Sequence, residues 1–210
     1  MTHFATSDEE DISYSLEQLR VFRELAPALR AEFGPGLLLH TANSGAIARM
    51  PDSWLDMVRP GLVSYGISPS PEPIPLDLRP CLALRGRITQ VREFPAGQRV
   101  SYGGIFTTRR PTVLGTLPIG YADGYRRALS NRGEALVRGR RAPLRGRVCM
   151  DQLVLDLTDL PGARVGDVAT LIGADGADRI TAWDLGQAIP TIVDEVLVGL
   201  GERLPRFYVE

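Results

Sequence analysis

Residues 68–80 read SPSPEPIPLDLRP, and this stretch decides how the rest of the chain is interpreted. Five of its residues are proline, which fixes φ and favours an extended, semi-rigid connection. Helix-like periodicity dominates before this connection, and short β-like runs dominate after it. We therefore expect two domains, residues 1–75 and residues 76–210.

The segment before the proline-rich connection has the pattern of a parallel α/β unit. The expected elements are a helix over 13–33, a buried strand over 37–40, a short helix over 44–50 and a buried strand over 54–58. An eight-stranded α/β barrel needs roughly 200 residues, so the first domain has room for about three strands. Three such strands would leave an open edge. We interpret the first domain as the end of a (β/α)8 barrel whose beginning is absent.

The segment after the connection has the pattern of an antiparallel β domain. Short runs rich in Val, Leu, Ile and Thr fill residues 81–173, with Gly, Pro and Asp between them. Residues 181–200 predict a return to helix, and residues 206–209 predict a short final strand. The expected fold class is therefore a partial α/β barrel followed by a mainly β domain.

Composition excludes several classes of partner. A net charge of −1 provides no basic field to attract nucleic acid or anionic lipid. No apolar run is long enough to span a membrane, and no signal-like segment opens the chain. Cys81 and Cys149 stand alone, outside any CxxC or His-rich context. Reduced thiols in a cytoplasmic protein, with no metal site, are the expectation.

The chain contains no lysine: all 24 of its Lys and Arg residues are arginine. No side-chain amine is therefore present to form a Schiff base or to act as a catalytic base.

Seven motifs occur in series along nearly the whole chain. They are HFATSDE (3–9), HTANSGA (40–46), MVRPGLVSYG (57–66), VSYGGIFTT (100–108), LPIGYADGY (117–125), GRVCMDQ (146–152) and RLPRFY (203–208). Their order and approximate spacing resemble alanine racemase. Decarboxylases of basic amino acids share that architecture, but the SYGG and CMDQ signatures favour the racemase.

The resemblance implies a fold, a cofactor and an assembly. The family has an N-terminal (β/α)8, or TIM, barrel that binds pyridoxal 5′-phosphate in its mouth, and a C-terminal β domain. Two subunits pair head to tail as a homodimer. The implied activity is an isomerase reaction, the interconversion of L- and D-alanine, which supplies D-alanine for peptidoglycan. On this basis the chain supplies the last barrel strands and the whole β domain.

Tyr102 is the residue that the resemblance makes the acid–base group on the L-alanine side, reaching the cofactor of the opposite subunit. Racemisation requires such groups on both faces of the α-carbon. A phenol with an ordinary pKa near 10 needs nearby positive charge to act as a base at neutral pH. The resemblance provides it through His3 and Arg59. Taken without the motif series, Tyr102 is interpreted more simply as an aromatic packed on a strand, and Arg59 as a surface ion-pairing residue.

Arg59 has a second implied role, hydrogen bonding to the pyridine nitrogen of the cofactor. A guanidinium cannot accept a proton, so the ring would stay unprotonated and would be a weaker electron sink. Ser44, Gly61 and Leu62 resemble the phosphate-binding elements, although Ser44 alone would read as an ordinary helix cap. His40, which precedes Ser44, is expected to be structural.

Three residues of the β domain resemble substrate contacts. Met150 corresponds to the residue whose backbone N–H holds the substrate carboxylate from the opposite subunit, although a methionine is otherwise core filler. Tyr121 is expected to restrict the pocket to a small side chain such as methyl. Asp151 resembles a residue at the entrance, or is simply a turn former.

The chain departs from the family in two respects. The Schiff-base lysine, a second lysine that carries a carbamate, and the arginine that meets the substrate carboxylate are all missing, so no covalent cofactor link is possible. Glu202 stands where a tyrosine often contacts the phosphate. We expect this acidic side chain to point elsewhere and phosphate binding to be weaker.

Three hypotheses remain open from the sequence. The chain is a fragment or split half of a racemase, inactive alone and completed by an N-terminal half. Alternatively, it is a non-catalytic or trans-complementing module that pairs with a full-length racemase subunit. The third possibility is a non-functional remnant. Substrates broader than alanine, such as serine, also remain conceivable.

Overall fold

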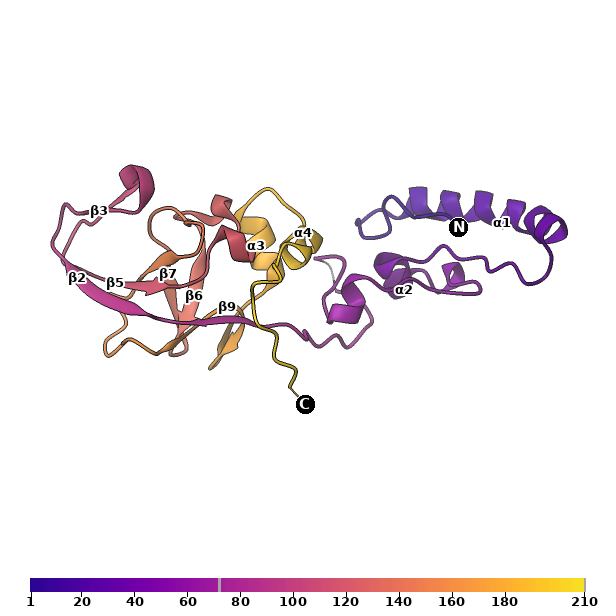
Figure 1. The fold of residues 1–210 in the computed structure, drawn as a ribbon. Coiled ribbons are helices and arrows are strands. Elements are labelled where there is room, and N and C mark those ends of the chain that lie inside the picture. Colours follow the sequence, from indigo (N-terminus) through magenta and orange to yellow (C-terminus); the bar gives the residue numbers. More distant parts are fainter. Residues whose placement is uncertain (72, 210) are drawn as a thin grey trace. The chain divides into compact units, whose positions relative to one another are not determined.

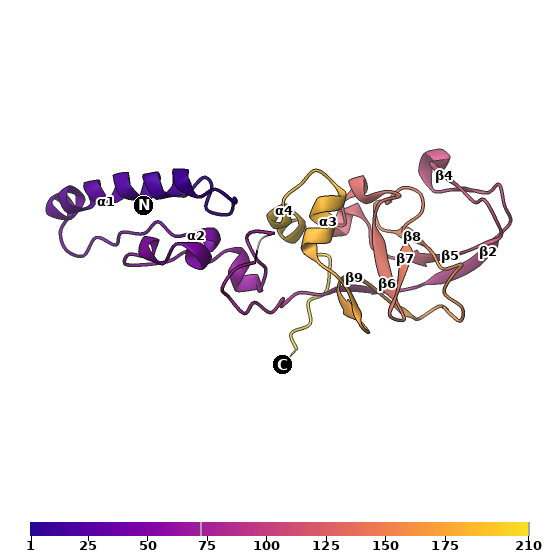
Figure 2. The same cartoon turned by 180° about the vertical axis from the view of Figure 1, so that it is seen from behind.

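The computed structural model describes residues 1–71 and 73–209, which divide into two compact units, Met1–Cys81 and Leu82–Glu210. Figure 1 and Figure 2 show the two units from opposite sides, with the helices α1 and α2 in the first and all the labelled strands, together with α3 and α4, in the second. Within the described ranges, no helix has the length and apolar character needed to cross a bilayer.

The first unit is built from two α-helices and two short 3-10 turns. These elements are α1 (Ser13–Phe33), α2 (Ser44–Arg49), η1 (Pro51–Ser53) and η2 (Leu62–Tyr65). α1 falls where the apolar periodicity predicts a helix, and α2 lies within the short helix expected over 44–50. Their buried faces meet in a small core formed by Phe4, Leu19, Ala42, Ala46 and Met50.

The two strands expected in this unit are not formed. Among the described residues of Met1–Cys81, the structure assigns no β-strand to 37–40 or 54–58. The second of these segments is also exposed rather than buried. One backbone hydrogen bond joins the segments, from Asp56 N to the Leu39 carbonyl (3.0 Å), and a second lies just beyond them, from Arg59 N to the Ala42 carbonyl (2.9 Å). A pair of parallel strands needs a continuous series of backbone hydrogen bonds and side chains packed over both faces of the sheet. Two hydrogen bonds do not form such a series.

The second unit is an antiparallel β domain, as the short apolar runs predict. Its strands are β1 (Leu84–Arg87), β2 (Gln90–Phe94), β3 (Arg99–Val100), β4 (Phe106–Thr107), β5 (Thr112–Leu117), β6 (Glu134–Val137), β7 (Arg140–Pro143), β8 (Leu153–Asp156), β9 (Val168–Asp175) and β10 (Asp178–Ile180). One sheet has the order β1-β9-β6-β7, with β10 also paired to β9. A second has the order β2-β5-β8, and β3 pairs with β4.

The core of this unit includes residues of β5, β6, β8 and β9, and β8 shows a clear alternation of burial. In β8, Leu153 and Leu155 are fully buried while Val154 and Asp156 are only half-buried. In the register between β8 and β5, Leu155 lies opposite Gly115. A Cβ at Gly115 would lie 2.5 Å from the Leu157 side chain, so the packing there requires glycine.

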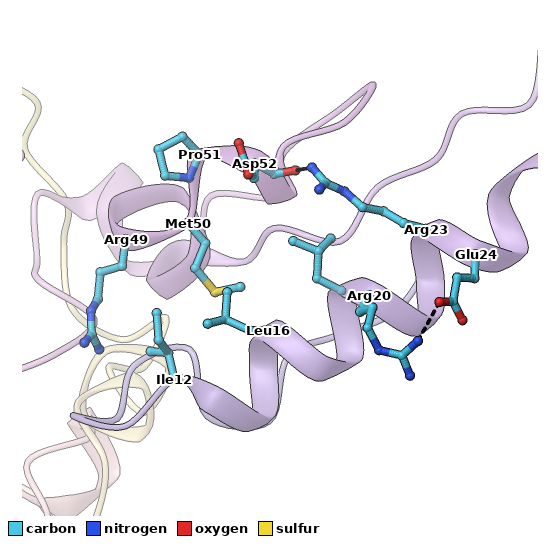
Figure 3. A pocket seen from close by; sticks show the side chains of 10 residues that line it. Ile12, Leu16, Arg20, Arg23, Glu24, Arg49, Met50, Pro51 and Asp52 are labelled. Carbon is cyan, nitrogen blue, oxygen red and sulfur yellow. Dashed lines mark hydrogen bonds and ion pairs between the residues drawn. The ribbon is translucent and has the colours of Figure 1, made fainter.

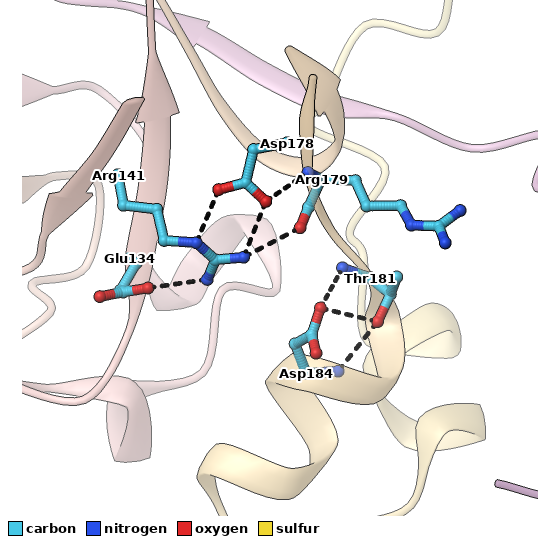
Figure 4. Close-up of polar contacts among 6 residues, drawn as sticks. All are labelled: Glu134, Arg141, Asp178, Arg179, Thr181 and Asp184. Carbon is cyan, nitrogen blue, oxygen red and sulfur yellow. Dashed lines mark hydrogen bonds and ion pairs between the residues drawn. The ribbon is translucent and has the colours of Figure 1, made fainter. Parts of the chain in front are cut away.

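The helical region near the C-terminus consists of two short helices rather than one, α3 (Ala182–Ala188) and α4 (Val193–Val198). Pro190 follows α3, and a proline cannot continue a helix. Thr181 and Asp184 form a reciprocal capping box at the start of α3 (Figure 4). The expected strand over 206–209 is not formed. Its side chains are almost fully exposed, so no neighbouring strand pairs with them.

Arg141 of β7 ties three segments of the second unit together. Its guanidinium donates to both carboxylate oxygens of Asp178, to Glu134 and to the carbonyl of Arg179 (Figure 4). The hydrogen bond from Arg141 lowers the pKa of Asp178 below its ordinary value of 3.8. The charged carboxylate is therefore favoured in the folded state.

This pKa shift predicts an acid-sensitive contribution to stability. A carboxyl group whose pKa is depressed by folding stabilises the protein above its unfolded pKa and loses that contribution as pH falls through the folded pKa. Asp178→Asn should therefore lower the unfolding free energy at pH 7 and make little difference well below pH 3.8. Urea unfolding of both proteins across pH measures this. In an Arg141→Gln background, the pH-dependent effect of Asp178→Asn should shrink to the part that the backbone hydrogen bond from Arg179 N supplies, and an unchanged effect there would contradict the assignment.

Candidate active site

Arg59 lies at the centre of a polar cluster in the first unit. Its Nη1 lies 2.7 Å from His40 Nδ1, and its Nη2 donates to the carbonyls of Thr2 (3.0 Å) and Thr41 (3.1 Å). A guanidinium only donates hydrogen bonds, so Nδ1 of His40 must be the acceptor and this ring is neutral. Partial burial and the positive charge of Arg59 lower the pKa of His40, which favours the same neutral form.

His40 is expected to be structural, and its contact with Arg59 is compatible with that expectation. The sequence motifs do not reveal its partner: His40 lies 2.7 Å from the guanidinium of Arg59, closer than His3, which lies 3.4 Å from it. The available signal was its position at the head of the HTANSGA motif, one residue before Thr41. The four partners of Arg59 hold the guanidinium in one orientation.

His3 is exposed and lies between two hydrogen-bond donors. Arg59 Nη2 is 3.4 Å from its Nδ1, and Asn43 Nδ2 is 3.4 Å from its Nε2. The Asn43 amide is oriented by its oxygen, which accepts from the Ser7 hydroxyl and from Ala46 N. A neutral imidazole can accept at only one nitrogen, so His3 cannot satisfy both neighbours at once. A proton on Nε2, with Nδ1 accepting from Arg59, leaves an N–H that can donate to an additional acceptor.

Ser44, Gly61 and Leu62 also lie together in the first unit. The Ser44 hydroxyl oxygen accepts from Gly61 N (2.9 Å) and lies 3.5 Å from Val63 N. Ser44 and Leu62 are buried, whereas Gly61 is exposed. Because the hydroxyl already accepts from the backbone, its own proton is available for an anionic oxygen. A side chain at Gly61 would lie over this hydroxyl, with its Cβ 3.5 Å from the Ser44 oxygen.

Tyr102 lies in the second unit, at the start of the 3-10 turn η3 (Tyr102–Gly104) and not on a strand. Its side chain is 73% exposed. Ser101 precedes it with φ of 62°, a conformation that few residues other than glycine adopt. The turn is anchored because Ser101 donates to the Arg147 carbonyl (2.9 Å) and Arg147 Nε donates to the Tyr102 carbonyl (3.1 Å).

Tyr121 and Met150 are held next to each other by their backbones. Tyr121 N donates to the Cys149 carbonyl (3.0 Å) and Ala122 N donates to the Met150 carbonyl (2.9 Å). A Cβ at Gly120 would lie 2.3 Å from the Cys149 carbonyl oxygen, so only glycine permits this approach. Both side chains are exposed, Tyr121 by 42% and Met150 by 57%, so neither is core filler.

The η4 turn (Tyr121–Asp123) also fixes the segment that contains Glu202. The buried Asp123 carboxylate accepts from Gly120 N (2.9 Å) and lies 3.6 Å from Arg203 Nε. Glu202 and Asp151 are exposed to solvent.

A separate open pocket of about 550 Å³ lies beside α1 and does not coincide with the predicted site. Figure 3 shows its lining, with apolar side chains of Ile12, Leu16 and Met50 and a rim that includes the Arg20–Glu24 ion pair. The Arg23 guanidinium donates a hydrogen bond to the Asp52 carbonyl. In the part of the chain that the structure describes, no cluster of three or more His, Cys, Asp or Glu could hold a metal ion.

Comparisons with known proteins agree across the whole chain. The family model described as the alanine racemase N-terminal domain matches residues 1–69, and the one for the C-terminal domain matches residues 81–208. The alanine racemase of Halothermothrix orenii is 46% identical over 209 residues, which are 99% of this chain and 55% of that protein. This chain therefore spans about half the length of the curated relatives that it matches.

Solved structures give the same result. The alanine racemase from Bacillus anthracis with bound L-Ala-P matches with a TM-score of 0.92 and 35% identity, covering 99% of this chain and 54% of that one. The alanine racemase from Bartonella henselae with covalently bound pyridoxal phosphate matches with a TM-score of 0.88 and 33% identity, covering 100% and 56%. The architecture is thus the end of a TIM barrel followed by an antiparallel β domain, and the chain belongs to the alanine racemase family.

Proposed function

We propose that this chain supplies the tyrosine-bearing half of a pyridoxal phosphate-dependent alanine racemase and racemises nothing without a lysine-bearing polypeptide. One observation supports the proposal. The chain holds the Arg59–His3 and Ser44–Gly61 contacts and an exposed Tyr102, but its sequence contains no lysine. The reaction is the interconversion of L- and D-alanine, whose D product is needed for peptidoglycan.

Tyr102 is proposed to exchange a proton with the substrate α-carbon on the L face, in the active site of a second subunit. Its high exposure suits a group that acts on a neighbouring molecule. His3 of that subunit, with Nδ1 accepting from Arg59, would offer its Nε2–H to the phenol oxygen. The cation behind the imidazole would stabilise negative charge on the phenol oxygen while the proton is transferred.

Substrate selection is proposed to rest on the Tyr121–Met150 pairing. The backbone N–H of Met150 would hold the substrate carboxylate, and the Tyr121 ring would limit the side chain to a methyl group. The two backbone hydrogen bonds between these segments keep both contacts at a fixed separation. L-Ala-P bound to the Bacillus anthracis relative supports a small amino acid as substrate.

The residues of the first unit fit the cofactor at two of its ends. Ser44 has a hydroxyl proton to donate to a phosphate, and Gly61 has no side chain to cover that hydroxyl. Arg59 is oriented by four partners and would donate to the pyridine nitrogen. When bound, pyridoxal 5′-phosphate supplies a ring that withdraws electrons from the substrate α-carbon. The covalent link reported for the Bartonella henselae relative requires an amine that these 210 residues lack.

Reconstitution tests the proposal. The chain is mixed with the part of the Halothermothrix orenii racemase that precedes its matched region, in the presence of pyridoxal phosphate. Racemisation should appear in the mixture and in neither component alone. Activity of the 210-residue chain by itself, or an inactive mixture that nevertheless forms a stable complex, would refute it.

A second candidate is a trans-complementing module that pairs with a full-length racemase subunit. The exposure of both Tyr102 and Met150 favours it, because both would act on a partner. The chain is mixed with a full-length relative whose corresponding tyrosine is replaced by phenylalanine. Recovered turnover supports the module, and failure to form a complex on gel filtration counts against it.

The assembly and location follow from the same proposal. A homodimer, or a pair completed by an N-terminal half, would place Tyr102 of one subunit against His3 of the other. The cytoplasm is the proposed compartment, consistent with Cys81 and Cys149 being free thiols.

A further inference from the structure

Asn131 lies between the two segments of the second unit that bear the proposed reacting and substrate-binding groups. It follows the η5 turn (Arg127–Leu129). Its φ of 56° is in the left-handed region, which asparagine tolerates better than most residues. The side chain of Leu129, the last residue of this turn, is 1% exposed and packs in the core.

Both ends of the Asn131 side chain are engaged. Its Oδ1 accepts from Gly146 N at 2.6 Å, and its Nδ2 donates to the Ile105 carbonyl at 3.1 Å. One partner is a donor and the other an acceptor, so the orientation of the amide is fixed. Ile105 ends the turn that carries Tyr102, and Gly146 begins the segment that carries Met150.

The neighbouring contacts reinforce this bridge. Ser130 accepts from Val148 N at 3.0 Å, which adds a second bond from the same turn to the Met150 segment. Gly146 approaches the Tyr102 turn so closely that a Cβ there would lie 2.7 Å from that of Ser101. The Asn131 side chain therefore joins its own turn to the Tyr102 turn and to the Met150 segment. The side chains of its neighbours do not do this: Ser130 bonds the Met150 segment, and Arg132 bonds the Ala188 carbonyl.

We propose that Asn131 is a positioning residue, which fixes the Tyr102 turn relative to the Met150 segment and so sets the distance between the proton-transfer group and the substrate carboxylate. Neither the motif series nor the site residues expected from it include this position. The catalytic part rests on the proposed racemase function, whereas the bridge itself does not. A displacement of about 1 Å between such groups costs up to roughly 100-fold in rate.

Two substitutions separate the two hydrogen bonds. Asn131→Asp retains an acceptor for Gly146 N and loses the donor to Ile105. Asn131→Gly retains the freedom to adopt positive φ and loses both. Arg132→Ala is the matched control, since its side chain reaches the Ala188 carbonyl and neither segment.

The structural readout uses the full chain alone. Amide hydrogen exchange at Gly146 should accelerate roughly fivefold to tenfold in Asn131→Gly and stay near the unsubstituted rate in Asn131→Asp, because one hydrogen bond contributes about 1 kcal/mol. The carbonyl ¹³C shift of Ile105 should change in both variants. Unchanged exchange at Gly146 in Asn131→Gly, with an unchanged Ile105 shift, would overturn the bridge.

The kinetic readout uses the reconstituted mixture. Asn131→Asp should lower kcat by roughly tenfold or more with little change in KM, and Asn131→Gly should also raise KM. Unchanged kinetics in both variants would overturn the positioning role even if the bridge is real. If the mixture with unsubstituted chain is inactive, the racemase proposal fails, and the exchange and shift data still decide whether Asn131 joins the two segments.

Discussion

Tyr102→Phe is expected to lower racemisation by the reconstituted mixture by roughly 10³-fold, because general acid–base catalysis contributes about 10² to 10⁴ in rate. The phenol hydroxyl is the only group removed. The side chain is 73% exposed, and Arg147 bonds the backbone carbonyl of this residue rather than its ring. Folding and assembly should therefore be unaffected, and the loss should appear in kcat.

The control for this variant is a second tyrosine on the same unit. Tyr208 belongs neither to the Arg59–His3 cluster nor to the Tyr121–Met150 pairing. Tyr208→Phe removes the hydroxyl of a residue near the C-terminus that is 93% exposed. Its activity should equal that of the unsubstituted mixture. Equal activity of Tyr102→Phe and Tyr208→Phe would remove Tyr102 from the proton transfer.

Leu155→Ala is expected to give the largest loss of stability, about 2 to 5 kcal/mol. Leu155 is 0% exposed on β8, and its removal leaves a cavity that neighbouring strands can fill only in part. Val154→Ala on the same strand is the control, because Val154 is only half-buried on the opposite face. Its cost should be clearly smaller.

Fluorescence of Trp183 in a Trp54→Phe background reports on the second unit, because Trp183 lies in α3 and Trp54 in the first unit. Urea unfolding followed in this way gives the free energy of unfolding for each variant. Equal losses for the two β8 variants would mean that the alternation along this strand does not define the core.

The sequence predicted those features that local patterns determine. The helix α1 follows from apolar periodicity, and the antiparallel second unit follows from short runs separated by turn residues. The strands expected over 37–40 and 54–58 were wrong because strand formation depends on partners that no local pattern supplies. The strand expected over 206–209 fails for the same reason, since its side chains are exposed.

The candidate site was predictable only in part. Motifs placed His3 and Arg59 in one cluster, and the structure brings them within 3.4 Å of each other. The roles of His40 and Asn131 depend on contacts between residues far apart in sequence, 19 positions for His40–Arg59 and 26 for Asn131–Ile105. Periodicity and composition carry no information on such contacts.

Exchange of the alanine α-hydrogen in D₂O with pyridoxal phosphate tests the central claim most directly, because it detects proton transfer on either face without requiring complete turnover. The 210-residue chain alone should exchange neither enantiomer, and the reconstituted mixture should exchange both. With Tyr102→Phe, the mixture should retain exchange of D-alanine and lose that of L-alanine, since the lysine-bearing half is proposed to act on the D face. Exchange of either enantiomer by the isolated chain, faster than with pyridoxal phosphate alone, would contradict the account.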